Sequence, residues 1–517
     1  MHVTRHRSAS PTSALPLTLL IAGSLGAAAC SDTPEEDPPN VIFITVDTLR
    51  ADRTTPYGYE RDTSPNLARL AAEGALFERA YALSSWTLPS MSMLLSGAIK
   101  PLADVTILPH HESISESFQN AGYRTCGVVG NSLLDADYGY DRGLDHFVLS
   151  EVNDEFNWTA ARILDEGLKW LEETDPASAD AARKPYFLWL HPVDPHAPYA
   201  PTNENQFPDP IPGDQSRELA AQSLAQQSEA RRSAGQTENA ATPAIGDADW
   251  KKIQRVRGLY DSEILQFDAQ LGRLLEVLAA RGELEKTIIV VTSDHGEGMW
   301  QRAANADESD KAKKGVFPAL YSGHGAQLFD EQVRVPLIFR GPGVPSGARV
   351  TEPVDLVDVV PSLLALADLP VKRVYGGTPL FEDGSTVTPP NEPVIAVCSR
   401  LSSITVDGRW RLHVPRPHRL KKPGVAIELY DLEADPLELN PVMDQGRIDD
   451  LTAQLVDWER SHAPDGLRAG DVAVDNQLYI KLHQLGYGGE AEHVKEFVKS
   501  LEEERDAELG TEPPKKQ

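Results

Sequence analysis

Acidic and imidazole side chains stand next to four apolar runs of this 517-residue chain. Asp47 and the pair Asp294–His295 directly follow such runs, His196 follows another after a short Pro-rich segment, and His324 precedes a fourth. Each group alone has a structural explanation, such as capping a helix or packing in a turn. Four such groups together favour a shared divalent cation, because carboxylate oxygens and imidazole nitrogens are common metal ligands.

The apolar runs predict the strands that would position these groups. Continuous β-branched and apolar residues predict strands at 41–46, 124–129, 185–190, 287–292 and 335–339, and apolar residues at helical spacing predict helices at 66–75, 260–278, 355–369 and 451–458. Strands that alternate with helices predict an α/β, doubly wound sheet. Ligands of such sheets bind beyond the carboxyl ends of the strands, where these groups are expected.

The chain length, together with the family resemblance whose motifs are given below, implies the domain organisation. We expect a catalytic domain at 38–370, a small C-terminal α+β subdomain at 371–466 and a charged tail at 467–517. Polar stretches near 204–249 and 301–320 predict two exposed insertions in the first domain.

Charge and cysteine content exclude several classes of protein. With 49 Lys and Arg against 78 Asp and Glu, the net charge is −29, so we expect no nucleic-acid partner. Three cysteines cannot build a disulfide scaffold or a Cys-rich zinc module. Cys126 and Cys398 lie among apolar residues and are expected in the core.

The N-terminus has the layout of an export signal. Arg5 and Arg7 precede an apolar run at 14–25, and small residues then lead to Cys30. This layout resembles a bacterial lipobox, so we expect a lipoprotein-type signal at 1–30 and lipidation of Cys30. The protein would then be exported and lipid-anchored to a bacterial membrane, on its periplasmic or cell-surface side. Plain signal-peptidase cleavage near the alanines is the alternative.

Several motifs, in collinear order, resemble the sulfatase branch of the alkaline phosphatase superfamily. They are NVIFITVDTLRAD at 40–52, SWTLPSMSMLLSG at 85–97, AGYRT at 121–125, GYDRG at 139–143, SDHGE at 293–297, GHG at 323–325, DE at 330–331 with RVPL at 334–337, and ELYDLEADP at 428–436. The resemblance implies an alkaline-phosphatase-like sandwich with a large mixed, mainly parallel sheet flanked by helices.

The resemblance also implies site roles, position by position. Asp47, Thr87, Asp294 and His295 match a set of ligands for one divalent metal ion, which is Ca²⁺, Mn²⁺ or Zn²⁺. Thr87 occupies the place of the cysteine that sulfatases oxidise to formylglycine. His196 matches a histidine that contacts the substrate's anionic group or leaving oxygen, and His324 lies near a basic residue of similar role; Ser90 and Asn131 are the expected substrate-binding residues.

Three positions depart from the family pattern. Thr48 stands where many sulfatases have a second Asp, Met91 replaces the arginine of the usual signature, and Asn131 stands where many members have a Lys. The loss of the arginine would remove positive charge from the anion pocket.

Thr87 decides the expected chemistry. Threonine has one hydroxyl and cannot form the hydrated aldehyde of formylglycine, so the standard sulfatase cycle is closed to this chain. A divalent cation would lower the pKa of the Thr87 hydroxyl and orient it for attack on phosphorus. We therefore expect a metal-dependent hydrolase acting on an anionic ester, a sulfate or phosphate ester on a glycan or lipid. The alternatives are a Thr-dependent phosphotransferase of the cell envelope and a non-catalytic pseudo-sulfatase that binds an anionic glycan or lipid.

Overall fold

The fold is that of a computed structural model, which describes residues 37–99, 107, 112–151, 158–174, 184–202, 206–208, 215–233, 243–304, 317, 319–371, 376–382, 386–390, 392–398, 400–415 and 427–461. The signal at 1–30 with Cys30, the tail at 467–517 and its neighbours from 462 lie outside the described residues. Within the described part of the chain, no helix has both the length and the apolar character needed to cross a membrane.

An eight-stranded sheet forms the centre of the fold, in the order β12-β2-β11-β7-β1-β6-β4-β5. The strands are β1 (Asn40–Val46), β2 (Ala75–Phe77), β4 (Arg124–Val129), β5 (His146–Leu149), β6 (Tyr186–His191), β7 (Thr287–Ser293), β11 (Leu337–Arg340) and β12 (Ala348–Val350). The five strands from β7 to β5 are parallel, whereas β11 pairs antiparallel with both neighbours. The predicted mixed, mainly parallel sheet is thus confirmed.

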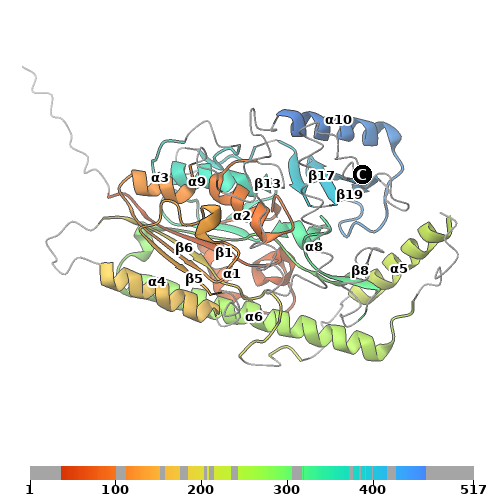
Figure 1. The fold of residues 1–517 in the computed structure, drawn as a ribbon, viewed down its shortest axis with the longest axis horizontal. Helices are drawn as coiled ribbons and strands as arrows, with labels where there is room; N and C mark the ends of the chain where they lie inside the picture. Colours follow the sequence, from red (N-terminus) through yellow and green to blue (C-terminus); the bar gives the residue numbers. More distant parts are fainter. Residues whose placement is uncertain are drawn as a thin grey trace, which may run out of the picture. The chain divides into compact units, whose positions relative to one another are not determined.

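Helices cover both faces of this sheet (Figure 1). The central strands carry apolar side chains on both faces, so both faces must be buried. Val41 and Phe43 of β1 pack in one core with α2 (Thr87–Ser96), α3 (Ile114–Asn120) and α9 (Val359–Leu366). Ile42 and Ile44 pack in a second core with α1 (Pro65–Glu73), α4 (Ala160–Thr174) and α6 (Asp247–Ala280). The helices predicted at 66–75, 260–278 and 355–369 correspond to α1, to part of α6 and to α9 with the turn before it.

Three segments differ from the sequence prediction. Pro336 interrupts the strand predicted at 335–339, because proline has no N–H to donate to a ladder, and β11 begins after it. The polar stretch near 204–249 contains the helix α5 (Ser216–Ser233), whose Ala220 and Leu224 are buried against β8 (Gly298–Ala303). The start of the loop predicted from residue 301 belongs to β8 itself.

A second sheet follows in the C-terminal part, in the order β16-β17-β18-β19, with α10 (Gln445–Ser461) packed on it (Figure 1). Its strands are Val394–Val397, Leu401–Val406, Trp410–Pro415 and Glu428–Asp431. The remaining elements are β3 (Ala80–Tyr81), β9 (Leu320–Gly323), β10 (Arg334–Val335), β13 (Val354–Asp355), β14 (Phe381–Glu382), β15 (Thr386–Val387), α8 (Asp330–Val333) and short 3-10 turns. The predicted sandwich with a small C-terminal α+β part is confirmed.

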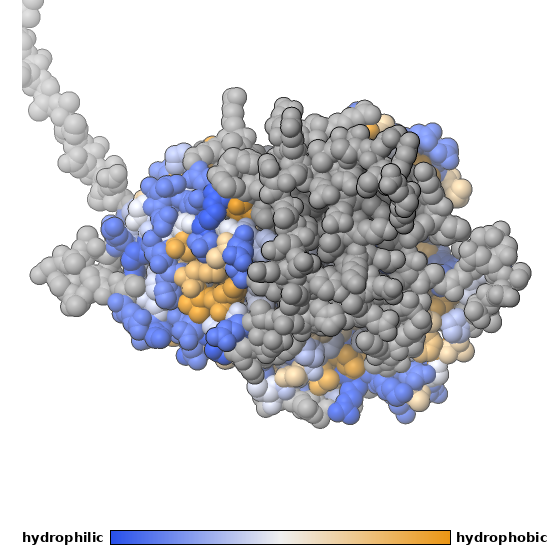
Figure 2. All heavy atoms as spheres, in the orientation of Figure 1, coloured by the Kyte–Doolittle hydropathy of each residue, from blue (hydrophilic) through white to orange (hydrophobic). Residues whose placement is uncertain are grey.

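Hydrophilic side chains surround a small apolar area on the described surface visible in Figure 2. Among the described residues, the large apolar side chains that are exposed are Val371, Ile427, Leu437 and Met443. This surface agrees with the excess of acidic residues in the composition.

Candidate active site

Three neighbouring parallel strands end at the candidate active site. β1 lies between β6 and β7, with Ile44 opposite Leu190 and Val46 opposite Ser293. This register brings the carboxyl ends of the three strands together, so that Asp47, His191 and Asp294 emerge side by side. The site lies where the α/β sheet was expected to carry it.

Asp47, His191 and Asp294 form a buried cluster. Each has one ligand atom within 4.8 Å of a ligand atom on the other two, and all three side chains are fully buried. Asp47 Oδ1, His191 Nε2 and Asp294 Oδ2 lack hydrogen-bond partners, although His191 Nε2 lies 3.7 Å from Asp47 Oδ2. Within the described residues no Lys or Arg pairs with either carboxylate. Two buried carboxylates without a cationic side chain, beside an imidazole nitrogen, fit a divalent cation.

The surroundings shift the two carboxyl groups in opposite directions. Burial raises the pKa of Asp47, but the imidazoles of His196, His191 and His295 outweigh burial and hold that pKa well below its usual range. Burial and repulsion from Asp47 raise the pKa of Asp294. Two carboxyl groups that repel each other in a buried site are stabilised together by a positive ion.

Thr87 and His295 form the second part of the site. Thr87 is the first residue of α2, and its Oγ1 lies 3.1 Å from His295 Nε2. His295 Nδ1 lies 2.8 Å from the carbonyl oxygen of Gly296. A carbonyl only accepts hydrogen bonds, so Nδ1 carries the hydrogen and Nε2 offers its lone pair to Thr87. Burial lowers the pKa of His295, which favours this neutral form.

The same nitrogen joins Thr87 to the cluster at the strand ends. His295 Nε2 is 3.2 Å from Asp294 Oδ2, and the backbone N–H groups of Thr48 and His295 donate to Asp294 Oδ1 at 3.1 and 2.8 Å. Thr48 adopts a φ of 57°, a rare conformation for a β-branched residue, which places its N–H toward Asp294. The ligand set expected from the sequence, Asp47, Thr87, Asp294 and His295, is therefore gathered at one place.

Two further imidazoles extend from His295 toward the surface. The ring of His324 lies 4.4 Å from that of His295 and 5.3 Å from that of His196, measured between centroids. Gly323 and Gly325 flank His324 with φ values of 104° and 87°, a conformation that glycine adopts without steric cost. His196 and His324 thus both reach the site, as the sequence predicts.

Glu297 supports His324 through its carboxylate. Both oxygens of its carboxylate lie 3.4 Å from His324 Nδ1. Burial raises the pKa of Glu297, but His324 outweighs burial and the pKa is lowered. A carboxylate at this position orients the His324 ring.

The expected substrate-binding residues point to the ends of the strands. Asn131 donates from Nδ2 to Asp47 Oδ2 at 2.8 Å, and Ser90 donates from Oγ to the backbone oxygen of Asp294 at 2.6 Å. Both side chains therefore hold the candidate metal ligands in position. Met91 is fully buried in the core that contains α2, so its side chain lies in the protein interior.

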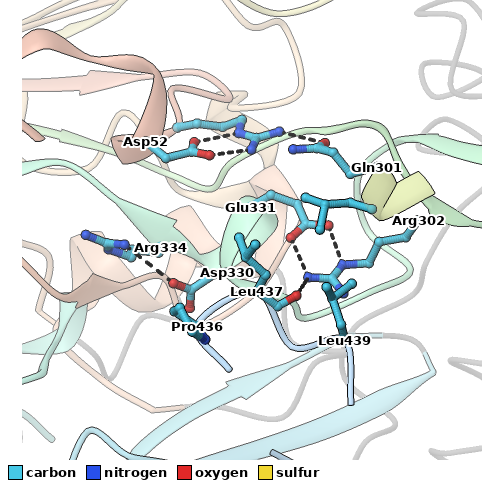
Figure 3. A pocket seen from close by; sticks show the side chains of 11 residues that line it. Asp52, Gln301, Arg302, Asp330, Glu331, Arg334, Pro436, Leu437 and Leu439 are labelled. Atoms are coloured by element: carbon cyan, nitrogen blue, oxygen red, sulfur yellow. Dashed lines mark hydrogen bonds and ion pairs between the residues drawn. The ribbon is translucent and has the colours of Figure 1, made fainter. Parts of the chain in front are cut away.

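A separate cavity of about 110 Å³ lies where Arg50, three residues after Asp47, meets the C-terminal part of the chain (Figure 3). Its arginines are paired with acids: Arg50 with Asp52, Arg302 with Glu331, and Arg334 with Asp330. The balanced charges give this cavity no excess positive charge for an anionic ester.

His191 is the residue that the sequence reasoning missed. The sequence analysis selects His196, which lies five residues later in the same Pro-rich segment. The signal was nevertheless present, because His191 directly follows the apolar run at 185–190, as Asp47 follows its own run.

Comparison with known proteins identifies the family of this chain. The family described as Sulfatase matches residues 39–369. The arylsulfatase of Clostridium perfringens is 23% identical over 409 residues, which cover 66% of this chain and 77% of that protein.

Two solved structures share the fold. The phosphonate monoester hydrolase of Agrobacterium radiobacter has a TM-score of 0.59 at 20% identity, covering 82% of this chain and 96% of that one. A protein solved with its substrate D-glucosamine-2-N,6-O-disulfate has a TM-score of 0.61 at 20% identity, covering 82% and 98%. With more than half of its length matched by the family, this chain belongs to the sulfatase family of the alkaline phosphatase superfamily and is a hydrolase of sulfuric or phosphoric esters.

Proposed function

We propose that the protein is a metal-dependent hydrolase that cleaves an anionic ester with Thr87 as nucleophile, and that phosphorus is the preferred centre of attack. The observation that carries this proposal is the 3.1 Å separation of Thr87 Oγ1 and His295 Nε2. The hydroxyl faces a nitrogen lone pair inside a buried site that also holds the carboxylates of Asp47 and Asp294.

Asp47, Asp294, His295 and Thr87 would hold the ion, with Ca²⁺, Mn²⁺ and Zn²⁺ as the candidates. When bound, a divalent cation supplies positive charge that lowers the pKa of a nearby hydroxyl and neutralises charge on the ester oxygens. The site needs that charge, because its carboxylates would otherwise repel an anionic substrate. Asn131 and Ser90 keep the carboxylate and backbone of the ligands in place through the hydrogen bonds described above.

The chain's own residues supply the nucleophile and the proton. Thr87 Oγ forms a bond to phosphorus as the bond from phosphorus to the leaving oxygen breaks, and the hydroxyl proton passes to water. His324, oriented by Glu297, donates a proton to the leaving oxygen, while His196 contacts the anionic group. Attack by water on phosphorus then releases Thr87 and completes the hydrolysis.

The natural substrate is an anionic ester on a glycan or lipid outside the cytoplasm. The relative solved with a disulfated glucosamine supports a sugar ester, and the phosphonate monoester hydrolase supports a phosphorus centre. The basic and apolar residues before Cys30 support export and a lipid anchor in a bacterial membrane. Incorporation of labelled fatty acid into the full chain, lost in Cys30→Ala, tests the anchor.

A substrate panel tests the chemistry. Nitrophenyl sulfate, phosphate monoester, phosphodiester and phosphonate monoester are each assayed with purified protein, with and without a chelator. We expect chelator-sensitive turnover of a phosphorus ester that exceeds turnover of the sulfate. Turnover of sulfate alone would contradict the preference for phosphorus.

Two observations favour a second candidate, a pseudo-sulfatase that binds an anionic glycan or lipid without cleaving it. Met91 is apolar and buried, and Asn131 is neutral, so the site lacks two positive charges that the family pattern provides. Binding of a sulfated or phosphorylated glycan without turnover of any ester would support this candidate. Transfer of the phosphoryl group to an added alcohol, in preference to water, would identify a phosphotransferase instead.

A further inference from the structure

We propose that His191 is a ligand of the divalent cation, and that two imidazoles make the site select a first-row ion such as Zn²⁺ or Mn²⁺ over Ca²⁺. This inference rests on the proposed function in one respect, the presence of a cation at the ends of β1 and β7. It adds a residue outside the expected ligand set and narrows the class of ion.

The first argument is the convergence of atoms that lack partners. His191 Nε2, Asp47 Oδ1 and Asp294 Oδ2 are all buried and without hydrogen bonds, and each of these three residues has a ligand atom within 4.8 Å of a ligand atom on each of the other two. A buried polar atom without a hydrogen-bond partner costs about 1–3 kcal/mol. Three such atoms in one cluster therefore favour a common partner. A single cation satisfies all three, whereas a water molecule cannot satisfy two carboxylate oxygens and an imidazole equally well.

The second argument is the orientation of the His191 ring. His191 Nδ1 lies 2.8 Å from Thr45 Oγ1, and the indole N–H of Trp189 donates to the same oxygen at 2.9 Å. A hydroxyl oxygen has two acceptor positions, so Thr45 can accept from both neighbours. With Nδ1–H donated to Thr45, Nε2 carries a lone pair directed at the carboxylates. A hydrogen-bonded second nitrogen is the usual arrangement of a metal-ligating histidine.

The position of His191 in the sheet gives the third argument. His191 is the last residue of β6 and stands beside the end of β1, opposite the side from which β7 supplies Asp294 and His295. A cation at the end of β1 is therefore reached from three strands. Asp47 contributes from the middle strand, and an imidazole is available on each flanking strand.

The donor set then predicts the ion. Two imidazoles and two carboxylates suit Zn²⁺ and Mn²⁺, because imidazole is a borderline ligand. Ca²⁺ prefers six to eight oxygen ligands, and this site replaces two of them with nitrogen. We therefore expect weak binding of Ca²⁺.

Metal titration of the full chain, stripped with a chelator, tests the assignment without measuring activity. Zn²⁺, Mn²⁺ and Ca²⁺ are titrated by calorimetry, and pulsed electron paramagnetic resonance of the Mn²⁺ form counts coupled imidazole nitrogens. We expect Zn²⁺ and Mn²⁺ to bind at least ~10-fold more tightly than Ca²⁺, with couplings from two imidazoles. His191→Gln should weaken Zn²⁺ binding by roughly 100-fold or more and remove one of the two couplings.

Two further variants keep the test decisive. His413→Gln replaces a buried histidine that contacts Glu438 in the C-terminal sheet, and it should retain metal affinity and both couplings. If His191→Gln does not fold, Thr45→Val keeps the imidazole but removes the partner that Nδ1 shares with the Trp189 N–H, and it should weaken Zn²⁺ binding by about 10-fold.

Unchanged affinity and two couplings in folded His191→Gln would overturn the assignment, as would tighter binding of Ca²⁺ than of Zn²⁺ by the natural protein. Thr87-dependent turnover would leave the proposed function standing in that case. Loss of one coupling in His191→Gln, together with no turnover of any ester, would sustain the ligand assignment and contradict the proposed function.

Discussion

Thr87 and His295 show how single residues define the chemistry of this site. The carbonyl of Gly296 fixes which ring nitrogen of His295 carries the hydrogen, and the free lone pair faces the Thr87 hydroxyl. The reaction then depends on a pair of residues whose hydrogen-bonding roles are set by the backbone.

Sequence reasoning at the residue scale succeeded where a side chain directly follows a strand. The structure brings Asp47 and the pair Asp294–His295 together because parallel strands deliver their carboxyl ends to one edge, and Thr87 reaches them from the start of α2. Contacts between segments far apart in the sequence could not be predicted in this way. The bond from Asn131 to Asp47 and the pairing of Glu297 with His324 depend on loop conformations that no periodicity encodes.

Met91 gives a prediction about the missing arginine. Its side chain is fully buried in the core, so Met91→Arg would bury an unpaired charge and should lower the free energy of unfolding by roughly 3 kcal/mol or more. Met91→Leu, of similar volume, should cost less than about 1.5 kcal/mol. Denaturant unfolding measures both. A stable Met91→Arg protein with increased ester turnover would show that this side chain faces the substrate pocket.

His324 gives a prediction about proton donation. If His324 protonates the leaving oxygen, His324→Gln should slow the hydrolysis of esters with poor leaving groups, such as phenyl esters, by about 10²–10⁴-fold. Nitrophenyl esters, whose leaving group needs little protonation, should be affected much less. Steady-state kinetics on the two esters measures this ratio, and an equal loss on both would assign His324 a binding role.

At the scale of elements, strand prediction worked best in the centre of the sheet. β4 has the predicted bounds, β1 and β7 each extend one residue beyond the prediction, and β6 is shifted by one residue. These strands are predicted well because they are buried on both faces and form continuous apolar runs. The prediction was weaker for α5 and the first part of α6. The segment around α5 is mostly polar, and only a few residues such as Ala220 and Leu224 pack against β8.

α6 also carries a pH-sensitive support for the segment that contains His196. Glu263 accepts a hydrogen bond from the backbone N–H of Ala200 at 2.7 Å, while its other oxygen has no hydrogen-bond partner. Burial, with repulsion from Asp194, raises the pKa of Glu263 to about 9. The folded protein thus binds a proton that the unfolded chain releases near pH 4.5, so this group's contribution to the free energy of unfolding falls as pH rises from about 4.5 through 9.

Glu263→Gln should remove this dependence. The amide oxygen still accepts from Ala200, and no charge is buried, so the variant should be more stable than the natural protein by about 1–3 kcal/mol at pH 8 and by less at pH 5. Thermal unfolding at the two pH values measures the difference. A variant that is less stable at pH 8 would show that the carboxylate has a cationic partner.

At the scale of the whole molecule, an ionic network connects the catalytic part to the C-terminal sheet. Glu438 is buried 3.1 Å from Arg411 Nη1 and 3.3 Å from His413 Nε2, and its Oε2 accepts from the backbone N–H of Asp330 at 2.8 Å. Burial opposes ionisation of Glu438, but Arg411 and His413 outweigh it and lower the pKa below its usual range. A lowered pKa means that the carboxylate stabilises the fold above about pH 4.5 and that this contribution is lost in acid.

Glu438→Gln should therefore destabilise the protein by roughly 1–3 kcal/mol at pH 7, because buried Arg411 loses one of its two carboxylate partners and keeps Asp330. The difference from the natural protein should shrink as pH falls below about 4. Denaturant unfolding between pH 3 and pH 7 measures the difference in the free energy of unfolding. Glu433→Gln, at an exposed position in the same segment after β19, is the control. A constant difference at all pH values would indicate a packing effect rather than a charge effect.

The central claim is that Thr87 attacks the ester in a cation-dependent site. The most direct measurement is mass spectrometry of the Thr87 peptide after the full protein is mixed with a phosphodiester and quenched in acid during turnover. We predict a phosphoryl adduct on Thr87 that disappears when the metal is removed by a chelator, with turnover reduced roughly 10³-fold or more in Thr87→Ala. Full chelator-sensitive turnover by Thr87→Ala, with no adduct on the natural protein, would contradict the account.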